Sequence, residues 1–87
     1  MRPEDVLEHL RKQPFEPIRI FMSDGARFDV RHPDMCVVSR STLYIGIPDP
    51  RTKGVAMRVA HCALIHVTRI EPVNGRRPRG SRGQARK

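Results

Sequence analysis

The chain contains few aromatic residues and no long apolar run. Its 87 residues include three Phe, one Tyr and no Trp, so Ile, Val, Leu and Met must supply the core of what we expect to be one domain. No apolar run approaches the roughly 20 residues that a membrane-spanning helix needs. The charged N-terminus, MRPEDVLEHLRKQ, lacks the apolar stretch of a signal peptide. We therefore expect a cytoplasmic protein that makes no membrane contact.

Motifs of catalysis and metal binding are absent from the sequence as well. It has no nucleophile-elbow serine and no glycine-rich phosphate loop. Cys36 and Cys62 do not form a Cys-x-x-Cys pair, and we expect two buried, reduced thiols. Cys36 lies four residues after His32, and His66 four residues after Cys62; in strands that spacing is roughly 13 Å, too far for one tetrahedral metal ion. We predict no enzyme activity, no cofactor and no metal, and little room for a ligand pocket.

Acidic residues are missing from the last 14 positions, so most of the net positive charge of the chain lies in this C-terminal segment. The chain has 17 Lys and Arg against 9 Asp and Glu, a net charge of +8. Six cations lie in segment 74–87, namely Arg76, Arg77, Arg79, Arg82, Arg86 and Lys87. Subtracting these 6 from 17 leaves 11 cations against 9 acids in residues 1–73, a net charge of about +2. We predict a nearly neutral domain over residues 1–73 and a disordered basic tail over 74–87.

The run Phe15–Arg31, FEPIRIFMSDGARFDVR, predicts two strands joined by a tight reversal. Asp24-Gly25 is typical of a two-residue turn, but that register would place charged residues on the apolar face of the hairpin. A three-residue loop over residues 23–25 makes one face wholly apolar, with Gly25 in the left-handed conformation. The predicted partners are Ile18 with Val30, Ile20 with Phe28, Met22 with Ala26, Arg19 with Asp29 and Phe21 with Arg27.

The remainder of residues 1–73 predicts one helix and several short strands. Pro3–Lys12 has apolar residues at helical spacing, a Pro in its first turn and acidic residues at its start. We expect strands at Met35–Arg40, Thr42–Ile47, Val55–Ala60 and His66–Glu71, and one helical turn at His61–Ile65. In Val55–Ala60 the apolar Val55, Met57 and Val59 share one face. Short, mostly antiparallel strands with one apolar face predict a mainly β fold, a small five-stranded barrel of SH3-like or Sm-like type with an N-terminal helix.

Two groups of residues are candidates for nucleic-acid binding. The six cations of segment 74–87 suit phosphates through charge and bases through guanidinium stacking; a merely solubilising tail is the alternative, because no aromatic residue is interleaved with them. On the hairpin, Arg19, Phe21 and Arg27 are expected to face outward together, as a base-stacking platform, a subunit interface or ordinary cross-strand packing, of which we favour packing. The expected partners are RNA or DNA; the rival is self-association or a protein partner.

The run FEPIRIFMSDGARFDVRHPDM, followed by TLYIGIPDP and HVTRIEP, resembles a family of short bacterial proteins to which no activity is assigned, over Pro14–Pro72. The helix and hairpin are more loosely similar to the bacterial Sm-like RNA chaperone, whose short helix precedes five strands curled into a barrel that assembles as a ring. The base-binding Asp-Gln-Phe of that family falls on Asp34-Met35-Cys36, and its Lys-His pair on Ala60-His61, so only the histidine of that pair matches. The resemblance implies the barrel fold and argues against uridine binding.

Overall fold

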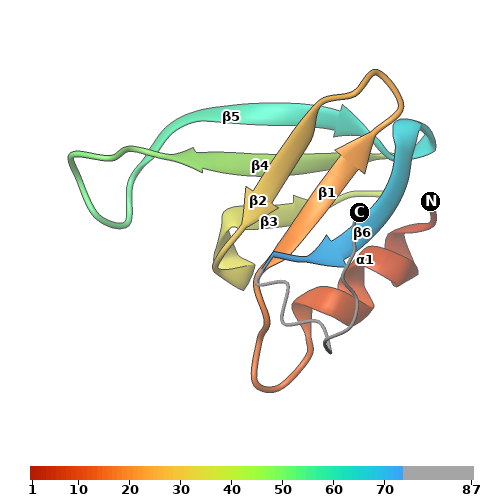
Figure 1. Cartoon of the computed structure of the whole chain (residues 1–87), viewed down its shortest axis with the longest axis horizontal. Coiled ribbons are helices and arrows are strands. Elements are labelled where there is room, and N and C mark those ends of the chain that lie inside the picture. The colour runs from red at the N-terminus through yellow and green to blue at the C-terminus, as the bar shows by residue number, and fades with distance from the viewer. Residues whose placement is uncertain (74–87) are drawn as a thin grey trace, which may run out of the picture.

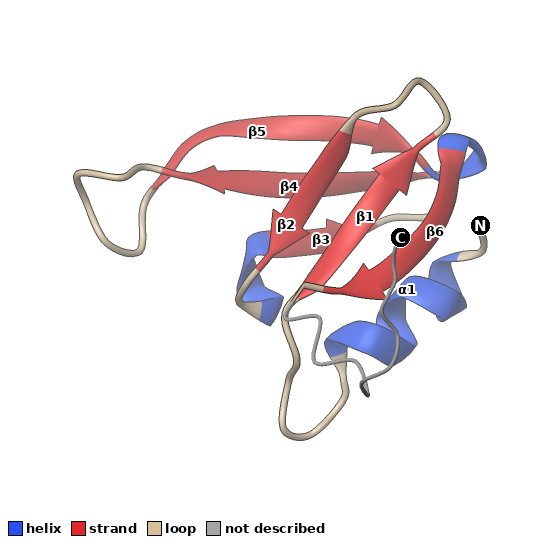
Figure 2. Cartoon of the chain, viewed as in Figure 1, coloured by secondary structure: helices blue, strands red, loops and turns tan. Residues whose placement is uncertain are grey.

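Two three-stranded antiparallel sheets and one helix form the part of the chain that the computed structural model describes, residues 1–73 (Figures 1 and 2). The helix is α1 (Pro3–Leu10), and the strands are β1 (Ile18–Met22), β2 (Arg27–Val30), β3 (Cys36–Val38), β4 (Thr42–Pro48), β5 (Ala56–Ala63) and β6 (Val67–Pro72). The first sheet has the order β2-β1-β6 and the second β3-β4-β5. The prediction of a disordered tail over 74–87 lies outside the described residues.

The hairpin of β1 and β2 has the register that the sequence predicts. Its partners are Ile18 with Val30, Arg19 with Asp29, Ile20 with Phe28 and Phe21 with Arg27. The Met22 N–H donates to the Ala26 carbonyl over 2.8 Å, and the Gly25 N–H donates to the Met22 carbonyl over 3.0 Å. Gly25 has a φ of +94°, in the left-handed region where glycine is favoured. The three-residue loop is confirmed.

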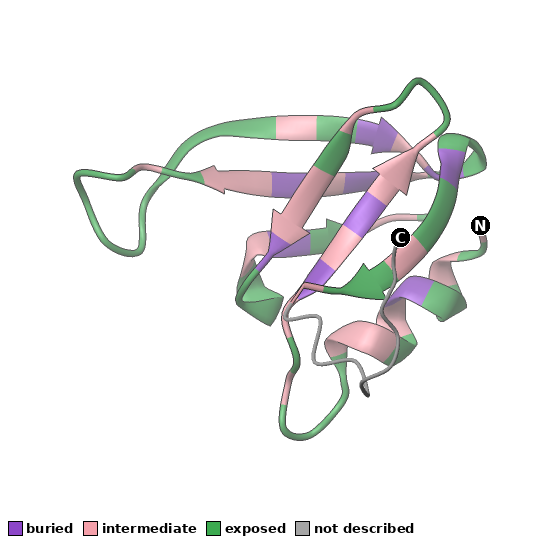
Figure 3. Cartoon of the chain, in the orientation of Figure 1, coloured by how far each residue is buried: buried purple, intermediate pink, exposed green. Residues whose placement is uncertain are grey.

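The core lies between the two sheets, whose strands cross in Figure 1. Ten apolar residues are buried, namely Val6, Ile18, Ile20, Val30, Cys36, Leu43, Ile45, Cys62, Leu64 and Val67. They come from the helix and from both sheets (Figure 3). Both cysteines are buried and free, as predicted. The N-terminal ammonium donates to the Leu64 carbonyl over 3.1 Å, which ties the start of the chain to the turn that follows β5.

The predicted five-stranded barrel is wrong, because residues 1–73 form six strands in two separate sheets. A 3-10 turn at Pro33–Met35 separates β2 from β3, and a second at Leu64–His66 separates β5 from β6. Proline has no N–H to donate, so the ladder cannot continue through Pro33. The chain therefore passes from one sheet to the other through turns instead of through bent, continuous strands.

The boundaries of β5 differ most from the prediction. The strand continues to Ala63, and the helical turn expected at 61–65 follows at Leu64–His66. Leu43 lies opposite Cys62, and because paired residues point to the same side of a sheet, both enter the core. Alternation then turns the apolar face of β5 outward: Met57 and Val59 are 54% and 50% exposed. The helix also ends two residues early, at Leu10 instead of Lys12.

Candidate nucleic-acid interface

A groove lies between β2 and the hairpin formed by β4 and β5. It consists of two adjoining cavities of about 540 and 510 Å³, which share Asp29, Arg31 and Pro48 in their walls. Both volumes fall within the roughly 300–1,000 Å³ typical of ligand sites, so the expectation of little room for a pocket is wrong. We call this feature the cationic groove; its charged wall residues are Arg19, Arg27, Asp29, Arg31, Asp49, Arg51, Lys53 and Arg58.

Charge is strongly segregated into the cationic groove. Six of its charged wall residues are Lys or Arg and two are Asp. Residues 1–73 as a whole hold 11 cations and 9 acids. The groove is therefore lined by more than half of these cations but by fewer than a quarter of these acids. The near-neutral balance of the domain therefore hides a local excess of positive charge. In the sequence these cations are spread from β1 to β5, and only the fold brings them together.

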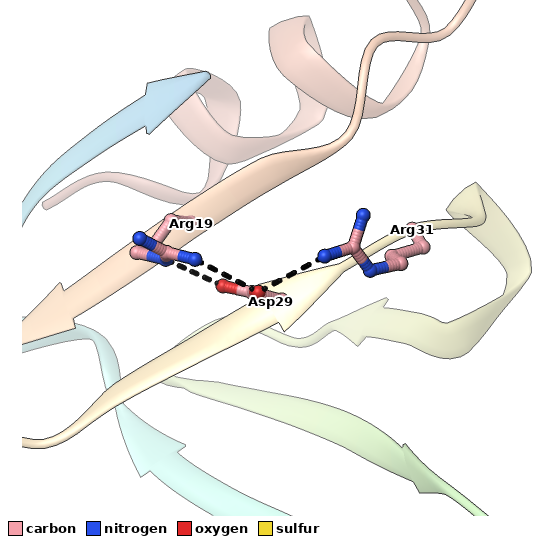
Figure 4. A network of polar contacts seen from close by, with 3 residues as sticks. All are labelled: Arg19, Asp29 and Arg31. Carbon is pink, nitrogen blue, oxygen red and sulfur yellow. Dashed lines mark hydrogen bonds and ion pairs between the residues drawn. The ribbon is translucent and has the colours of Figure 1, made fainter. Parts of the chain in front are cut away.

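Asp29 is the acidic centre of the groove and is bonded to two arginines (Figure 4). Arg19 donates from Nε to Oδ1 over 2.7 Å and from Nη2 to Oδ2 over 3.1 Å, and Arg31 donates from Nη2 to Oδ2 over 3.5 Å. The hydrogen bonds from Arg19 hold the pKa of Asp29 below its ordinary value and raise the pKa of Arg19. Arg19 is thus largely neutralised by its partner, whereas the long contact leaves Arg31 only weakly held.

Three other groove cations have no acidic partner. Among residues 1–73, Arg27, Lys53 and Arg58 form no ion pair. Arg51 approaches Asp49 at 3.8 Å, but Oδ1 of Asp49 also accepts the backbone N–H of Arg51 over 2.9 Å. Cations on two walls of a concave surface can contact successive phosphates of one backbone, because the charges face a common space.

The structure brings together two of the three hairpin residues singled out by sequence. Arg19 and Arg27 line the groove. The ring of Phe21 lies outside the groove wall, beneath the guanidinium of Arg69 at 3.9 Å from its centroid. Arg69 also donates from Nε to Glu71 Oε2 over 2.6 Å, so this cation–π contact is cross-strand packing of β1 against β6.

Sequence reasoning missed four of the groove cations: Arg31, Arg51, Lys53 and Arg58. No local signal marks them, because they come from the residue after β2, the loop after β4 and the first half of β5. The six cations of the C-terminal segment, predicted as binding residues, lie outside the described residues.

The histidines and cysteines are the other candidate reactive groups of residues 1–73. Burial raises the pKa of Cys36 to about 11 and also raises the pKa of Cys62, so both thiols are protonated and poorly nucleophilic at neutral pH. His66 Nδ1 lies 3.3 Å from the Ser23 hydroxyl. No three His, Cys, Asp or Glu side chains in the described part of the chain are placed to hold a metal ion. None of its helices is long and apolar enough to cross a membrane.

No family model, no curated protein and no solved structure was found to match the chain. The two family resemblances drawn from the sequence therefore stay predictions.

Proposed function

We propose that this chain is a small, non-enzymatic module that binds RNA or DNA through the phosphate backbone. The observation that carries the proposal is the excess of positive charge in the cationic groove. Six Lys and Arg side chains and only two Asp side chains line its two adjoining cavities. Arginine supplies five of these cations, and its planar donors match phosphate oxygens. The six cations of segment 74–87 add charge of the same sign. Together these groups support binding that depends on salt and little on sequence.

Single-stranded nucleic acid suits this groove better than a duplex. The cavity of about 510 Å³ has apolar wall residues, among them Met35, Pro48 and Val55, beside the cations Arg31 and Lys53. An unpaired base can contact such apolar side chains while its phosphate meets the cations. A paired base cannot enter the cavity without leaving its duplex.

The test compares two double variants of the full chain with the same loss of charge. Arg27→Gln with Arg58→Gln removes two unpaired cations from the groove; Arg11→Gln with Arg40→Gln removes two cations elsewhere that also form no ion pair within residues 1–73. Fluorescence anisotropy with a short labelled single strand is measured over a salt titration. We expect the groove variant to bind more weakly and to lose about 1.4 from the slope of log K against log salt, since each single-strand phosphate contact contributes roughly 0.7.

Two outcomes would contradict the proposal. One is no binding of single-stranded RNA or DNA by the unmodified chain at low salt. The other is an equal loss of affinity in the two double variants, which would show that only net charge matters. A third variant, with Arg76, Arg77 and Arg79 changed to Gln in the full chain, measures the contribution of the C-terminal segment separately.

A further inference from the structure

The cavity of about 510 Å³ in the cationic groove combines apolar walls with charged groups of both signs. One apolar wall is made by Met35, which lies against β4 where Gly46 has no side chain: a Cβ at Gly46 would stand 3.0 Å from Cε of Met35. The thioether of methionine makes favourable contacts with aromatic rings. The cavity can therefore hold a flat, unpaired base against an apolar wall.

The two acids of the cationic groove differ in the partners of their carboxylates. Both oxygens of Asp29 accept hydrogen bonds from arginine. Asp49 accepts the backbone N–H of Arg51 at Oδ1 over 2.9 Å, and Nε of Arg51 approaches the same oxygen at 3.8 Å. Within residues 1–73, Oδ2 of Asp49 has no hydrogen bond and no ion pair, although the side chain is only 19% exposed. A largely shielded carboxylate in the cavity wall thus keeps one oxygen for a donor on a ligand.

Guanine is the base whose edges match these groups best. Its N1–H and N2–H are adjacent donors that can pair with the two oxygens of one carboxylate, because each oxygen accepts more than one hydrogen bond. Its O6 and N7 are acceptors that suit arginine, and Arg31, whose contact with Asp29 is 3.5 Å long, lines the same cavity. Adenine and cytosine carry an acceptor nitrogen beside their amino group, and uracil carries a carbonyl on each side of its N–H. Each of these bases would turn an acceptor toward the carboxylate.

We propose that this cavity is a guanine subsite, in which Asp49 accepts hydrogen bonds from N1–H and N2–H of one unpaired guanine in a bound single strand. The inference rests on the proposed function. It adds a preference for one base to backbone contacts that are otherwise independent of sequence. The cations of the groove bind the phosphates on either side of that guanine.

The test is fluorescence anisotropy of the full chain with a short labelled oligouridine strand. The same strand is also prepared with guanine, adenine or cytosine as its central base. We expect the guanine strand to have a dissociation constant about tenfold lower than the other three, which is the discrimination typical of a bidentate contact between a side chain and a base.

Asp49→Asn tests the carboxylate while keeping its local hydrogen bond. The asparagine Oδ1 can still accept the N–H of Arg51, but the amide nitrogen now turns a donor toward the donors of guanine. We expect the guanine and uridine strands to differ by less than about twofold in this variant. Oligouridine should bind it at least as tightly as it binds the unmodified chain, because the groove has lost a negative charge. Partial unfolding would instead weaken both strands.

Asp24→Asn is the matched control. Oδ1 of Asp24 accepts the backbone N–H of Ala26 over 3.0 Å, so the carboxylate makes the same kind of local hydrogen bond two residues along the chain. Asp24 lies in the loop between β1 and β2 and not in the walls of the cationic groove. The substitution removes the same charge, and we expect it to leave the preference for guanine unchanged.

Three results would overturn the inference. Equal affinity of the unmodified chain for the guanine and uridine strands, or a preference for guanine that persists in Asp49→Asn, would do so while leaving the proposed function in place. Guanosine monophosphate that competes as strongly as the guanine strand would assign the cavity to a free nucleotide instead. Absence of binding to every strand at low salt is the different result that contradicts the proposed function itself, and the inference with it.

Discussion

Asp29 limits the positive charge that the cationic groove presents. Its carboxylate accepts hydrogen bonds from Arg19 and Arg31 and stands in the wall of both cavities. A phosphate bound as proposed would compete with it for the weakly held Arg31, whose contact is 3.5 Å long. Arg19, held by two shorter bonds, stays with Asp29 and positions it.

The Asp29 ion pair predicts a small, pH-dependent contribution to stability. The pKa of Asp29 is lower in the folded protein than its ordinary value of 3.8, so the pair stabilises the fold above that value, and the contribution is lost as pH falls through the folded pKa. Because both side chains are partly exposed, the contribution is below about 1 kcal/mol. We expect Asp29→Asn to be less stable than the unmodified chain at pH 7, and the difference to be smaller at pH 2, in urea unfolding at both pH values.

Glu8→Gln is the control for Asp29→Asn, since Glu8 is exposed on α1 and forms no ion pair within residues 1–73. Its free energy of unfolding should follow that of the unmodified chain at both pH values. A stability difference for Asp29→Asn that is as large at pH 2 as at pH 7 would show that packing, and not the ion pair, is what the substitution removes.

At the scale of the element, the β1–β2 hairpin depends on one backbone conformation. Gly25 has a φ of +94°, and a Cβ built there would meet no atom within 4 Å. Any cost of a side chain at this position therefore comes from the backbone and not from a clash. We expect Gly25→Ala to lower the free energy of unfolding by about 1 kcal/mol, measured by urea denaturation.

Gly25→Asn provides the matched comparison, because asparagine adopts the left-handed conformation more readily than alanine does. It should be more stable than Gly25→Ala although its side chain is larger. Equal stability of the two variants would show that the left-handed conformation at position 25 is not what limits the hairpin.

β5 shows how a neighbouring strand decides which face of an element is buried. Its own sequence favours burial of Met57 and Val59 over Arg58 and Ala60. Pairing with β4 decides otherwise, because Leu43 and Ile45 place Cys62 and Ala60 on the core side. An apolar face that includes Met57 and Val59 is thereby left exposed.

At the scale of the whole molecule, stability rests on a small core between the two sheets. Ile20 is fully buried at its centre, whereas Ile65 is 81% exposed. We expect Ile20→Val to lower the free energy of unfolding by about 1 kcal/mol and the melting temperature by about 4–8 °C. The same deletion of one methylene group in Ile65→Val should change the free energy by less than about 0.5 kcal/mol. Equal melting temperatures for the two variants would contradict this placement of the core.

The sequence alone determined those features that depend on neighbouring residues. Alternation of apolar residues and a glycine able to take a positive φ were enough to predict the hairpin register, and the charge count separated a near-neutral domain from a basic C-terminal segment. Pro3 and the first-turn acids placed the start of the helix. Each of these signals depends on residues that are close together in the sequence, so it can be recognised without the tertiary structure.

Only the tertiary structure decided that the strands form two sheets, which face of β5 is exposed, and where the cationic groove lies. Side chains of a strand that pairs with β4 must point to the sides that the pairing with β4 imposes. Two 3-10 turns divide the strands into two sheets instead of one barrel. The six groove cations come from β1, β2 and the residue after it, β5, and the loop between β4 and β5. These cations lie close together because the elements that carry them pack against one another. No spacing along the chain predicts that arrangement.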